Sequence, residues 1–271
     1  MSNSPQPAPA SFVLLEARHD SIATLVMNRP DRLNALDTKL VTALNDALGR
    51  ISKDESVRVV VLTGAGRAFC AGGDLALIGQ VRAAGATHDL ELLLTSGTKA
   101  VLTMRCMPQP VIAAVNGAAA GAGMNLALAA DVRIAAEEAM FGQNFAKVGL
   151  FPDFGGTYFL PQLVGPAKAA ELFYTGEMID AKTALQLGIV NRVVPATQLE
   201  AEVNSLARRI AEGPPLAIHA VKKTLFASES EKLTLALANE VQEQTRCYFS
   251  QDCSEGISAF FEKRPPTFRG K

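Results

Sequence analysis

The chain has 271 residues, of which 48% are hydrophobic and 20% are charged, and its 26 basic and 27 acidic side chains give a formal net charge of −1. This balance is typical of a soluble globular protein, and it argues against a basic nucleic-acid-binding domain, an acidic disordered tail and a disulfide-stapled miniprotein. The four cysteines, Cys70, Cys106, Cys247 and Cys253, form no CxxC pair, and no nearby histidine completes a zinc spacing. We therefore expect reduced thiols and no metal.

The first eleven residues, 1–11, are polar and rich in proline, with neither a basic start nor an apolar run. This composition predicts a loose leader rather than a secretory signal, and therefore a cytoplasmic protein.

The predicted elements of the first two thirds alternate between strands and helices. Two β-type runs, 12–16 and 22–28, flank the turn-forming sequence HDS and predict a hairpin. Apolar residues at helical spacing predict a helix over 38–53, and the run RVVVL at 58–62 predicts a strand that is covered on both faces. The following expected elements are helix 89–106, strand 110–115, helix 122–130 and strand 132–135. This repetition predicts an α/β fold with helices packed on sheets.

The segment 110–136 is rich enough in small apolar residues to resemble a membrane span. Four polar or charged residues interrupt it: Asn116, Asn125, Asp131 and Arg133. Because such side chains are costly at bilayer depth, we expect a buried core segment and no membrane partner. The small residues indicate that backbones approach closely there, or that a ligand lies against the main chain.

The last third is predicted to be mainly helical. The expected helices are 167–175, 181–187, 197–212, 215–227, 231–249 and 254–262, with a single β-type run at 189–194. We divide the chain into the leader 1–11, a core of residues 12–195 and a helical appendage of residues 196–271.

Three segments rich in glycine or turn-forming residues stand out: RAFCAGGDL (67–75), NGAAAGAGMNLALAAD (116–131) and GLFPDFGGTYFLPQLVG (149–165). None contains the GxGxxG or P-loop pattern of nucleotide-binding sites. In two of them a strand is followed by small residues and a helix start, which leaves backbone N–H groups without partners at the positive end of a helix dipole. A pair of such groups can hold a developing oxyanion, although glycines that only allow tight turns are the plainer interpretation.

Five segments, in order, resemble the successive motifs of the enoyl-CoA hydratase/isomerase (crotonase) family. They are the three segments above, preceded by NRPDRLNAL (28–36) and followed by GISAFFEKRPPTFRGK (256–271). The resemblance spans residues 12–271 and implies an α/β crotonase (ClpP-like) fold of repeated ββα units with a helical C-terminal region that forms trimers. Within the family, the chain looks most like the ring-1,2-epoxyphenylacetyl-CoA isomerase-like and enoyl-CoA isomerase members.

The resemblance also implies roles for individual residues. The backbone N–H groups of Gly73 and Ala122 would hold the thioester carbonyl, and Arg29, Arg32 and Lys263 would contact the CoA phosphates. For these basic residues ordinary surface charge is the alternative, and Lys263, if it is used, would come from a neighbouring subunit. The remaining implied substrate- or CoA-binding positions are Ala35, Ala71, Asp74, Leu75, Asn125 and Phe145. Asp74 is also expected to cap the helix that follows it.

Two departures from the family pattern bear on the reaction. The hydratases carry two glutamates that activate water, and the matching positions here are Asn125 and Phe145. Asp153 falls where family isomerases and aromatic-thioester dehalogenases place their acid. One carboxylate suffices for a 1,3-proton shift, and Phe151 and Phe154 would raise the pKa of Asp153 toward that of a working base. The alternative is that Asp153 only hydrogen-bonds its own turn.

We therefore expect an acyl-CoA isomerase acting on an enoyl-CoA or a ring-epoxide or oxepin-CoA substrate. Asp153 would be the acid–base group, no metal or other cofactor would be needed beyond the CoA of the substrate, and the chain would form a homotrimer or hexamer. The alternatives are a hydratase that works through Asp153 alone, a dehalogenase that uses Asp153 as a nucleophile, and a non-catalytic CoA- or RNA-binding family member. The neutral net charge disfavours RNA and other nucleic-acid partners.

Overall fold

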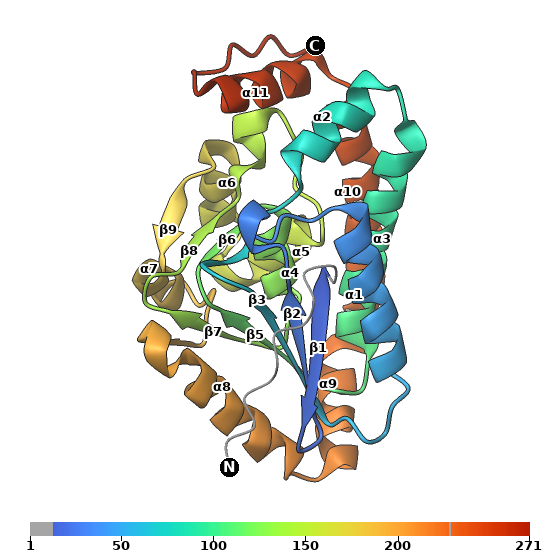
Figure 1. The fold of residues 1–271 in the computed structure, drawn as a ribbon, viewed down its shortest axis with the longest axis vertical. Helices are drawn as coiled ribbons and strands as arrows, with labels where there is room; N and C mark the ends of the chain where they lie inside the picture. The colour runs from blue at the N-terminus through green and yellow to red at the C-terminus, as the bar shows by residue number, and fades with distance from the viewer. Residues whose placement is uncertain (1–12, 228) are drawn as a thin grey trace.

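The computed structural model describes residues 13–227 and 229–271, so the predicted leader 1–11 lies outside the described residues. Two β-sheets surrounded by helices form the described chain (Figure 1). The strands are β1 (Leu14–His19), β2 (Ile22–Met27), β3 (Val59–Gly64), β4 (Ala68–Cys70), β5 (Val111–Val115), β6 (Ala118–Ala120), β7 (Val132–Ala136), β8 (Met140–Gly142), β9 (Met178–Asp180) and β10 (Arg192–Val194). The helices are α1 (Thr38–Ile51), α2 (Leu75–Ala83), α3 (Thr87–Cys106), α4 (Ala122–Leu128), α5 (Gly156–Val164), α6 (Pro166–Thr175), α7 (Ala181–Gln186), α8 (Ala196–Ala211), α9 (Pro215–Ala227), α10 (Ser230–Tyr248) and α11 (Gln251–Glu262), with short 3-10 helices η1 (Pro30–Arg32) and η2 (Asn144–Val148).

The larger sheet has the strand order β1-β2-β3-β5-β7-β10, and only β1 runs antiparallel to its neighbour. The predicted hairpin is confirmed, since β1 and β2 pair from Leu14 opposite Met27 to His19 opposite Ile22. Asp20 and Ser21 form its two-residue turn with φ values of 48° and 62°. Two consecutive positive φ values match the right-handed twist of the flanking strands, which is why such turns close tight hairpins.

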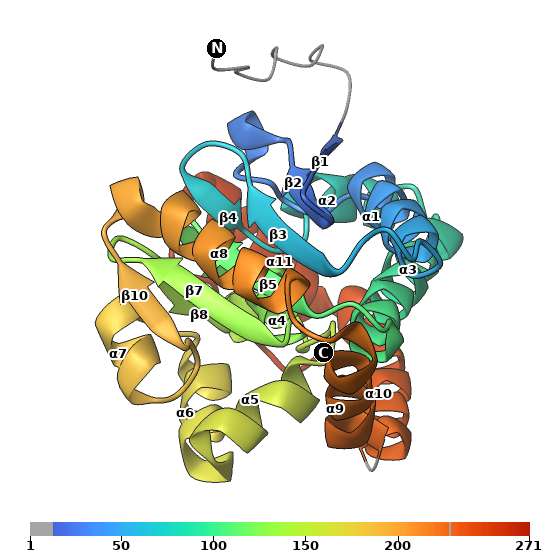
Figure 2. The same cartoon turned by 90° about the horizontal axis from the view of Figure 1, so that it is seen from below.

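Both faces of the larger sheet are covered. Val59 and Val61 of β3 pack in one apolar cluster with Leu199 of α8, and Figure 2 shows α8 lying across the strands on that side. Val60 and Leu62 belong to the cluster on the opposite face, which includes residues of α1, α3 and α4. The alternating residues of β3 therefore enter two separate cores, which explains its continuous apolar sequence and confirms the predicted doubly covered strand.

The strands of the smaller sheet, which has the order β4-β6-β8-β9, are not among the elements that the apolar pattern predicts. Its strands have three residues each, too few to show an alternating pattern. Strands β3, β5 and β7 of the larger sheet are each followed by a strand of the smaller sheet, and then by helical structure. These three successive ββα units confirm the expected crotonase fold.

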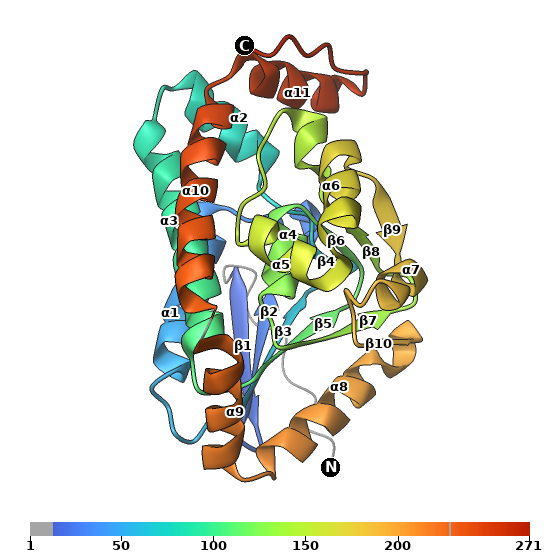
Figure 3. The ribbon, with the colours of Figure 1, turned by 180° about the vertical axis from the view of Figure 1, so that it is seen from behind.

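The helices of the last third pack against the core rather than apart from it. Figure 3 shows α10 running beside α3 and α5, and α11 contacts both α2 and η2. The boundary drawn at residue 195 therefore separates elements that lie side by side. None of the described helices is both long and apolar enough to cross a bilayer.

Candidate active site

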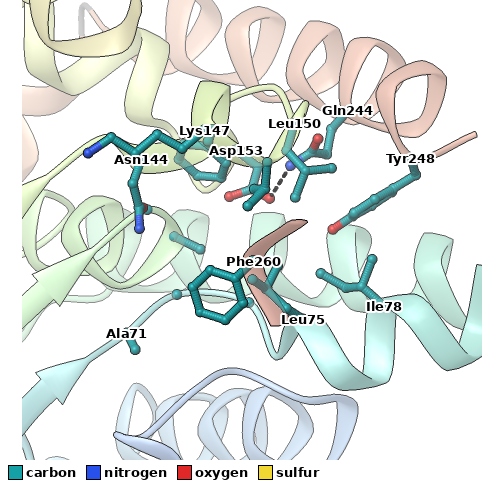
Figure 4. A pocket seen from close by; sticks show the side chains of 16 residues that line it. Ala71, Leu75, Ile78, Asn144, Lys147, Leu150, Asp153, Gln244, Tyr248 and Phe260 are labelled. Atoms are coloured by element: carbon teal, nitrogen blue, oxygen red, sulfur yellow. Dashed lines mark hydrogen bonds between the residues drawn. The ribbon is translucent and has the colours of Figure 1, made fainter. Parts of the chain in front are cut away.

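A cavity of about 120 Å³ lies where β4, β6 and β8 end (Figure 4). Because these strands are parallel, their carboxyl ends meet at one edge of the smaller sheet. The loops after them, the loop before α5, and helices α2, α10 and α11 supply the walls. The lining residues are Ala71, Gly72, Gly73, Leu75, Ile78, Gly121, Ala122, Asn144, Phe145, Lys147, Val148, Leu150, Asp153, Gln244, Tyr248 and Phe260.

Two backbone N–H groups at this cavity have no internal acceptor. Leu36 N donates to Gly72 O at 2.7 Å, and Asp74 N donates to Leu36 O at 3.0 Å. In this parallel bridge the N–H of Gly73 points away from Leu36. Ala122 is the first residue of α4, where a helix offers its N–H no acceptor. Neither N–H donates to any residue in 13–227 or 229–271.

Gly72 brings these two segments together. Its φ of +96° belongs to the region that favours glycine. A Cβ atom there would lie 2.8 Å from the carbonyl oxygen of Ala120 and 3.6 Å from the nitrogen of Ala122. The absence of a side chain at Gly72 therefore allows the two N–H donors to share one cavity.

Asp153 supplies the carboxyl group of the cavity, and its exposed fraction is 6%. Burial raises the pKa of this carboxyl to about 7; the hydrogen bond from Gln244 acts in the opposite direction, and the nearby charge of Glu240 adds to the rise. Gln244 Nε2 donates to Oδ2 at 3.0 Å, while Oδ1 has no partner among the described residues. One carboxylate oxygen is thus held by α10, and the other is buried without a hydrogen-bond partner among the described residues.

The predicted rise in the pKa of Asp153 is confirmed, but the predicted apolar wall is wrong. Phe151 and Phe154 do not line the cavity. Phe154 packs against α3, where a Cβ on Gly97 would lie 2.3 Å from its ring. The apolar surface near Asp153 comes instead from Phe145 and Leu150, together with residues of α2, α10 and α11.

Asn125 occupies a supporting position behind the acid. Its Nδ2 donates to the backbone oxygen of Asp153 at 2.7 Å, and its Oδ1 accepts from Gln143 Nε2 at 2.6 Å. The side chain is fully buried and does not line the cavity. A Cβ on Gly156 would lie 2.3 Å from Asn125 Nδ2, so the glycine gives the amide its space. We therefore correct the expected substrate contact of Asn125 to a positioning role for the Asp153 loop.

Side chains of helix α10 hydrogen-bond to the Asp153 loop and to the start of α5. Glu240 accepts hydrogen bonds from Gly155 N at 2.7 Å and from Thr157 N at 2.9 Å. These N–H groups lie at the start of α5, where the helix itself offers no acceptor. Gln244 Oε1 accepts from Phe151 N at 2.9 Å. Since Oε1 is occupied in this way, the amide can present only its N–H₂ to Asp153.

Comparisons with known sequences identify the family of the chain. Residues 17–271 match the family described as enoyl-CoA hydratase/isomerase. The chain belongs to the enoyl-CoA hydratase/isomerase family. It is 43% identical over 253 residues to a probable enoyl-CoA hydratase of Rhodobacter capsulatus, with 93% of this chain and 96% of that protein covered. It is 39% identical over 251 residues to the 1,2-epoxyphenylacetyl-CoA isomerase of Escherichia coli, with 92% and 95% covered.

A solved structure gives the same result for the fold. The crystal structure of an enoyl-CoA hydratase from Mycobacterium avium subsp. paratuberculosis superimposes with a TM-score of 0.87 at 33% identity, covering 95% of this chain and 99% of that one. The chain is therefore an enzyme of the enoyl-CoA hydratase/isomerase type, and an acyl-CoA substrate is consistent with its family.

Among the positions implied by resemblance to this family, Gly73, Ala122 and Asp153 meet in the one cavity. Ala71, Leu75 and Phe145 also line it, whereas Ala35 does not.

The basic and capping residues of the family motifs lie away from the cavity wall. Arg29 Nη2 lies 2.9 Å from Asp74 Oδ2 and 3.3 Å from Asp37 Oδ2, and Nη1 donates to the Ala35 carbonyl. Asp74 caps α2 as predicted, accepting from the N–H groups at positions 76 and 77. Arg32 and Lys263 are exposed, and the contact of all three basic residues with CoA phosphates stays a prediction.

Sequence analysis missed Glu240, Gln244 and Tyr248 because they follow the family's central motifs by almost a hundred residues. A signal for them does exist. They recur at a spacing of four on the same buried face of α10 as Leu233 and Leu237. Polar side chains in an otherwise apolar stripe are costly to bury without partners, so such a face predicts a polar site beneath the helix.

Proposed function

We propose that this family member is an acyl-CoA isomerase that catalyses a 1,3-proton shift. The observation that carries the proposal is that Asp153 is the one carboxylate among the described residues that line the cavity. The two positions at which hydratases of the family carry glutamate hold Asn125, which is committed to the Asp153 loop, and Phe145, which is apolar. Addition of water would need a second group to activate and hold the water, whereas a proton shift needs one.

The proposed reaction uses the two elements of the cavity together. The N–H groups of Gly73 and Ala122 donate to the thioester oxygen, and Asp153 removes a proton from one carbon of the acyl chain. The electron pair left behind delocalises through the double bond onto the thioester oxygen, where the two donors stabilise the negative charge. Asp153 then returns the proton two carbons along, and the double bond has moved with no net gain or loss of atoms.

The substrate of this proposal is an enoyl-CoA or a ring-epoxide or oxepin-CoA. Both substrate classes occur in the names of relatives, since one is a 1,2-epoxyphenylacetyl-CoA isomerase and another a probable enoyl-CoA hydratase. A pKa of about 7 suits the carboxyl for both halves of the shift, because it must accept and release a proton at neutral pH.

Asp153→Asn tests the proposal. The variant should bind CoA thioesters with unchanged affinity and lose isomerisation, while Asp46→Asn, which replaces an exposed aspartate of α1, should retain both. Turnover is followed on a panel of aliphatic and aryl enoyl-CoA thioesters in ¹⁸O-labelled water. Full activity of Asp153→Asn would refute the assignment of the acid, and ¹⁸O in the product would show hydration instead.

The proposal extends to the surroundings of the site. No cofactor is needed beyond the CoA of the substrate, with Arg29, Arg32 and Lys263 near its phosphates. The copies assemble as trimers or hexamers in the cytoplasm; exposed apolar side chains of the last helices support assembly, namely Leu216, Val221, Leu225, Leu235, Phe260 and Phe261. Light scattering at micromolar concentration measures this assembly, and a monomer would contradict it.

A further inference from the structure

Tyr248, the last residue of α10, lines the cavity and carries a polar group that the proposed proton shift does not use. Its exposed fraction is 2%. Figure 4 shows the ring reaching from the end of α10 with its hydroxyl directed into the cavity. The backbone beneath it is held, because Arg82 Nη1 donates both to the Tyr248 carbonyl and to the Ser250 carbonyl.

The hydroxyl of Tyr248 has no hydrogen-bond partner among residues 13–227 and 229–271. Asp153 is close enough to interact with it electrostatically, but the hydrogen bond to that carboxylate comes from Gln244. The other nearby walls are apolar and include Leu75, Ile78 and Leu150. The ring is buried while the hydroxyl faces the cavity, so a group that fills the cavity must either accept its hydrogen bond or leave the hydroxyl unpaired at a cost.

The chemical form of Tyr248 determines what it recognises. Burial and the charge of Asp153 both raise the pKa of the phenol well above its ordinary value, so the group is neutral wherever Asp153 is active. A neutral phenol can donate its hydrogen, and no hydrogen bond joins it to Asp153 in this structure. The thioester oxygen already has the N–H donors of Gly73 and Ala122, so a second acceptor is required.

We infer that the Tyr248 hydroxyl donates a hydrogen bond to an oxygen atom carried by the acyl group, and that the enzyme thereby selects oxygen-bearing acyl thioesters over hydrocarbon ones. Epoxide, cyclic ether, ketone and alcohol oxygens are all acceptors of the required kind. The inference rests on the proposed function, because it takes this cavity as the acyl site. Tyr248 is then a specificity-determining residue, and the apolar walls contact the carbon skeleton around that oxygen.

Binding of saturated CoA thioesters tests the inference, because they have no double bond to move. Two pairs replace one methylene group by an ether oxygen: phenoxyacetyl-CoA against 3-phenylpropanoyl-CoA, and 3-phenoxypropanoyl-CoA against 4-phenylbutanoyl-CoA. For at least one pair, the wild-type chain should bind the ether roughly 3- to 10-fold more tightly, which is the range for one neutral hydrogen bond. Tyr248→Phe should remove this preference and leave the Kd of the hydrocarbon thioester within about twofold, as expected when one hydroxyl alone is deleted.

Tyr174→Phe is the matched control, since it deletes the same hydroxyl from a ring on α6 that is 81% exposed and outside the cavity. It should keep the wild-type preference. The inference is overturned if the wild type binds the thioesters but prefers neither ether, or if the preference survives in a folded Tyr248→Phe. Failure of the proposed function gives a different result: the wild type then binds none of the four thioesters, or binds them without isomerising any enoyl-CoA.

Discussion

The buried carboxyl of Asp153 should make the protein less stable as the pH rises. The folded chain holds the pKa of this group at about 7, against 3.8 for an ordinary aspartate. The unfolded chain therefore gives up the proton first, and the folded state loses stability between about pH 4 and pH 7. Each tenfold change in the acid constant is worth about 1.4 kcal/mol, so the whole effect is about 4 kcal/mol.

Asp153→Asn removes this effect while keeping the size of the side chain and an oxygen for Gln244. The variant should exceed the wild type in free energy of unfolding by about 4 kcal/mol at pH 8, and by about 1–2 kcal/mol at pH 5. Urea unfolding at one fixed protein concentration measures both values, so that any subunit association affects the two proteins alike.

Asp180→Asn is the control for Asp153→Asn. Hydrogen bonds from Thr183 lower the pKa of Asp180, which caps α7 at the surface, so this variant should gain no stability at pH 8. Equal stability of Asp153→Asn and the wild type at pH 8 would refute the reasoning, because it would mean that the carboxylate carries no penalty for burial.

Three further predictions concern substitutions around the Asp153 loop and the oxyanion-hole segment. Gln244→Leu removes the hydrogen bond that lowers the pKa of Asp153, so the acidic limb of the kcat/KM profile against pH should move to higher pH. Glu240→Gln removes a charge that raises this pKa, so the same limb should move to lower pH; shifts of both variants in one direction would contradict the assignment. Gly72→Ala should cost about 1–3 kcal/mol in urea unfolding and reduce kcat, because of the positive φ and the 2.8 Å approach to the Ala120 oxygen. An unchanged urea midpoint for Gly72→Ala would show that the backbone around residue 72 accommodates a side chain without cost.

The larger sheet and most of the longer helices could be predicted because each has a periodic apolar pattern. Helix 38–53 is observed at Thr38–Ile51, and strand 58–62 at Val59–Gly64. The strands of the smaller sheet could not be predicted from periodicity, because three residues are too few to show a period. Helix α5 was also missed, because Pro161 lies inside it and a glycine begins it, and both residues are typical of turns.

The site could be predicted in part. Resemblance to the family placed Gly73, Ala122 and Asp153 together, and the structure brings the three to one cavity. It gave Asn125 the wrong kind of contact, because a motif fixes where a residue lies on its helix but not which way its amide hydrogen-bonds. It said nothing of Gln244 or Tyr248, whose roles depend on how α10 docks against a loop about 90 residues earlier in the chain.

The hydrogen bonds between the Asp153 loop and α10 have a consequence for how the chain folds during its synthesis. The three ββα units are synthesised before residues 240 and 244. A nascent chain therefore contains Gly73, Ala122 and Asp153 before it contains the α10 side chains that hold the Asp153 loop. If the proposed function holds, Asp153 therefore reaches its working position only after α10 has been made. Under the same proposal, a fragment that ends before residue 240 would lack these contacts to the Asp153 loop, even where its sheets have formed.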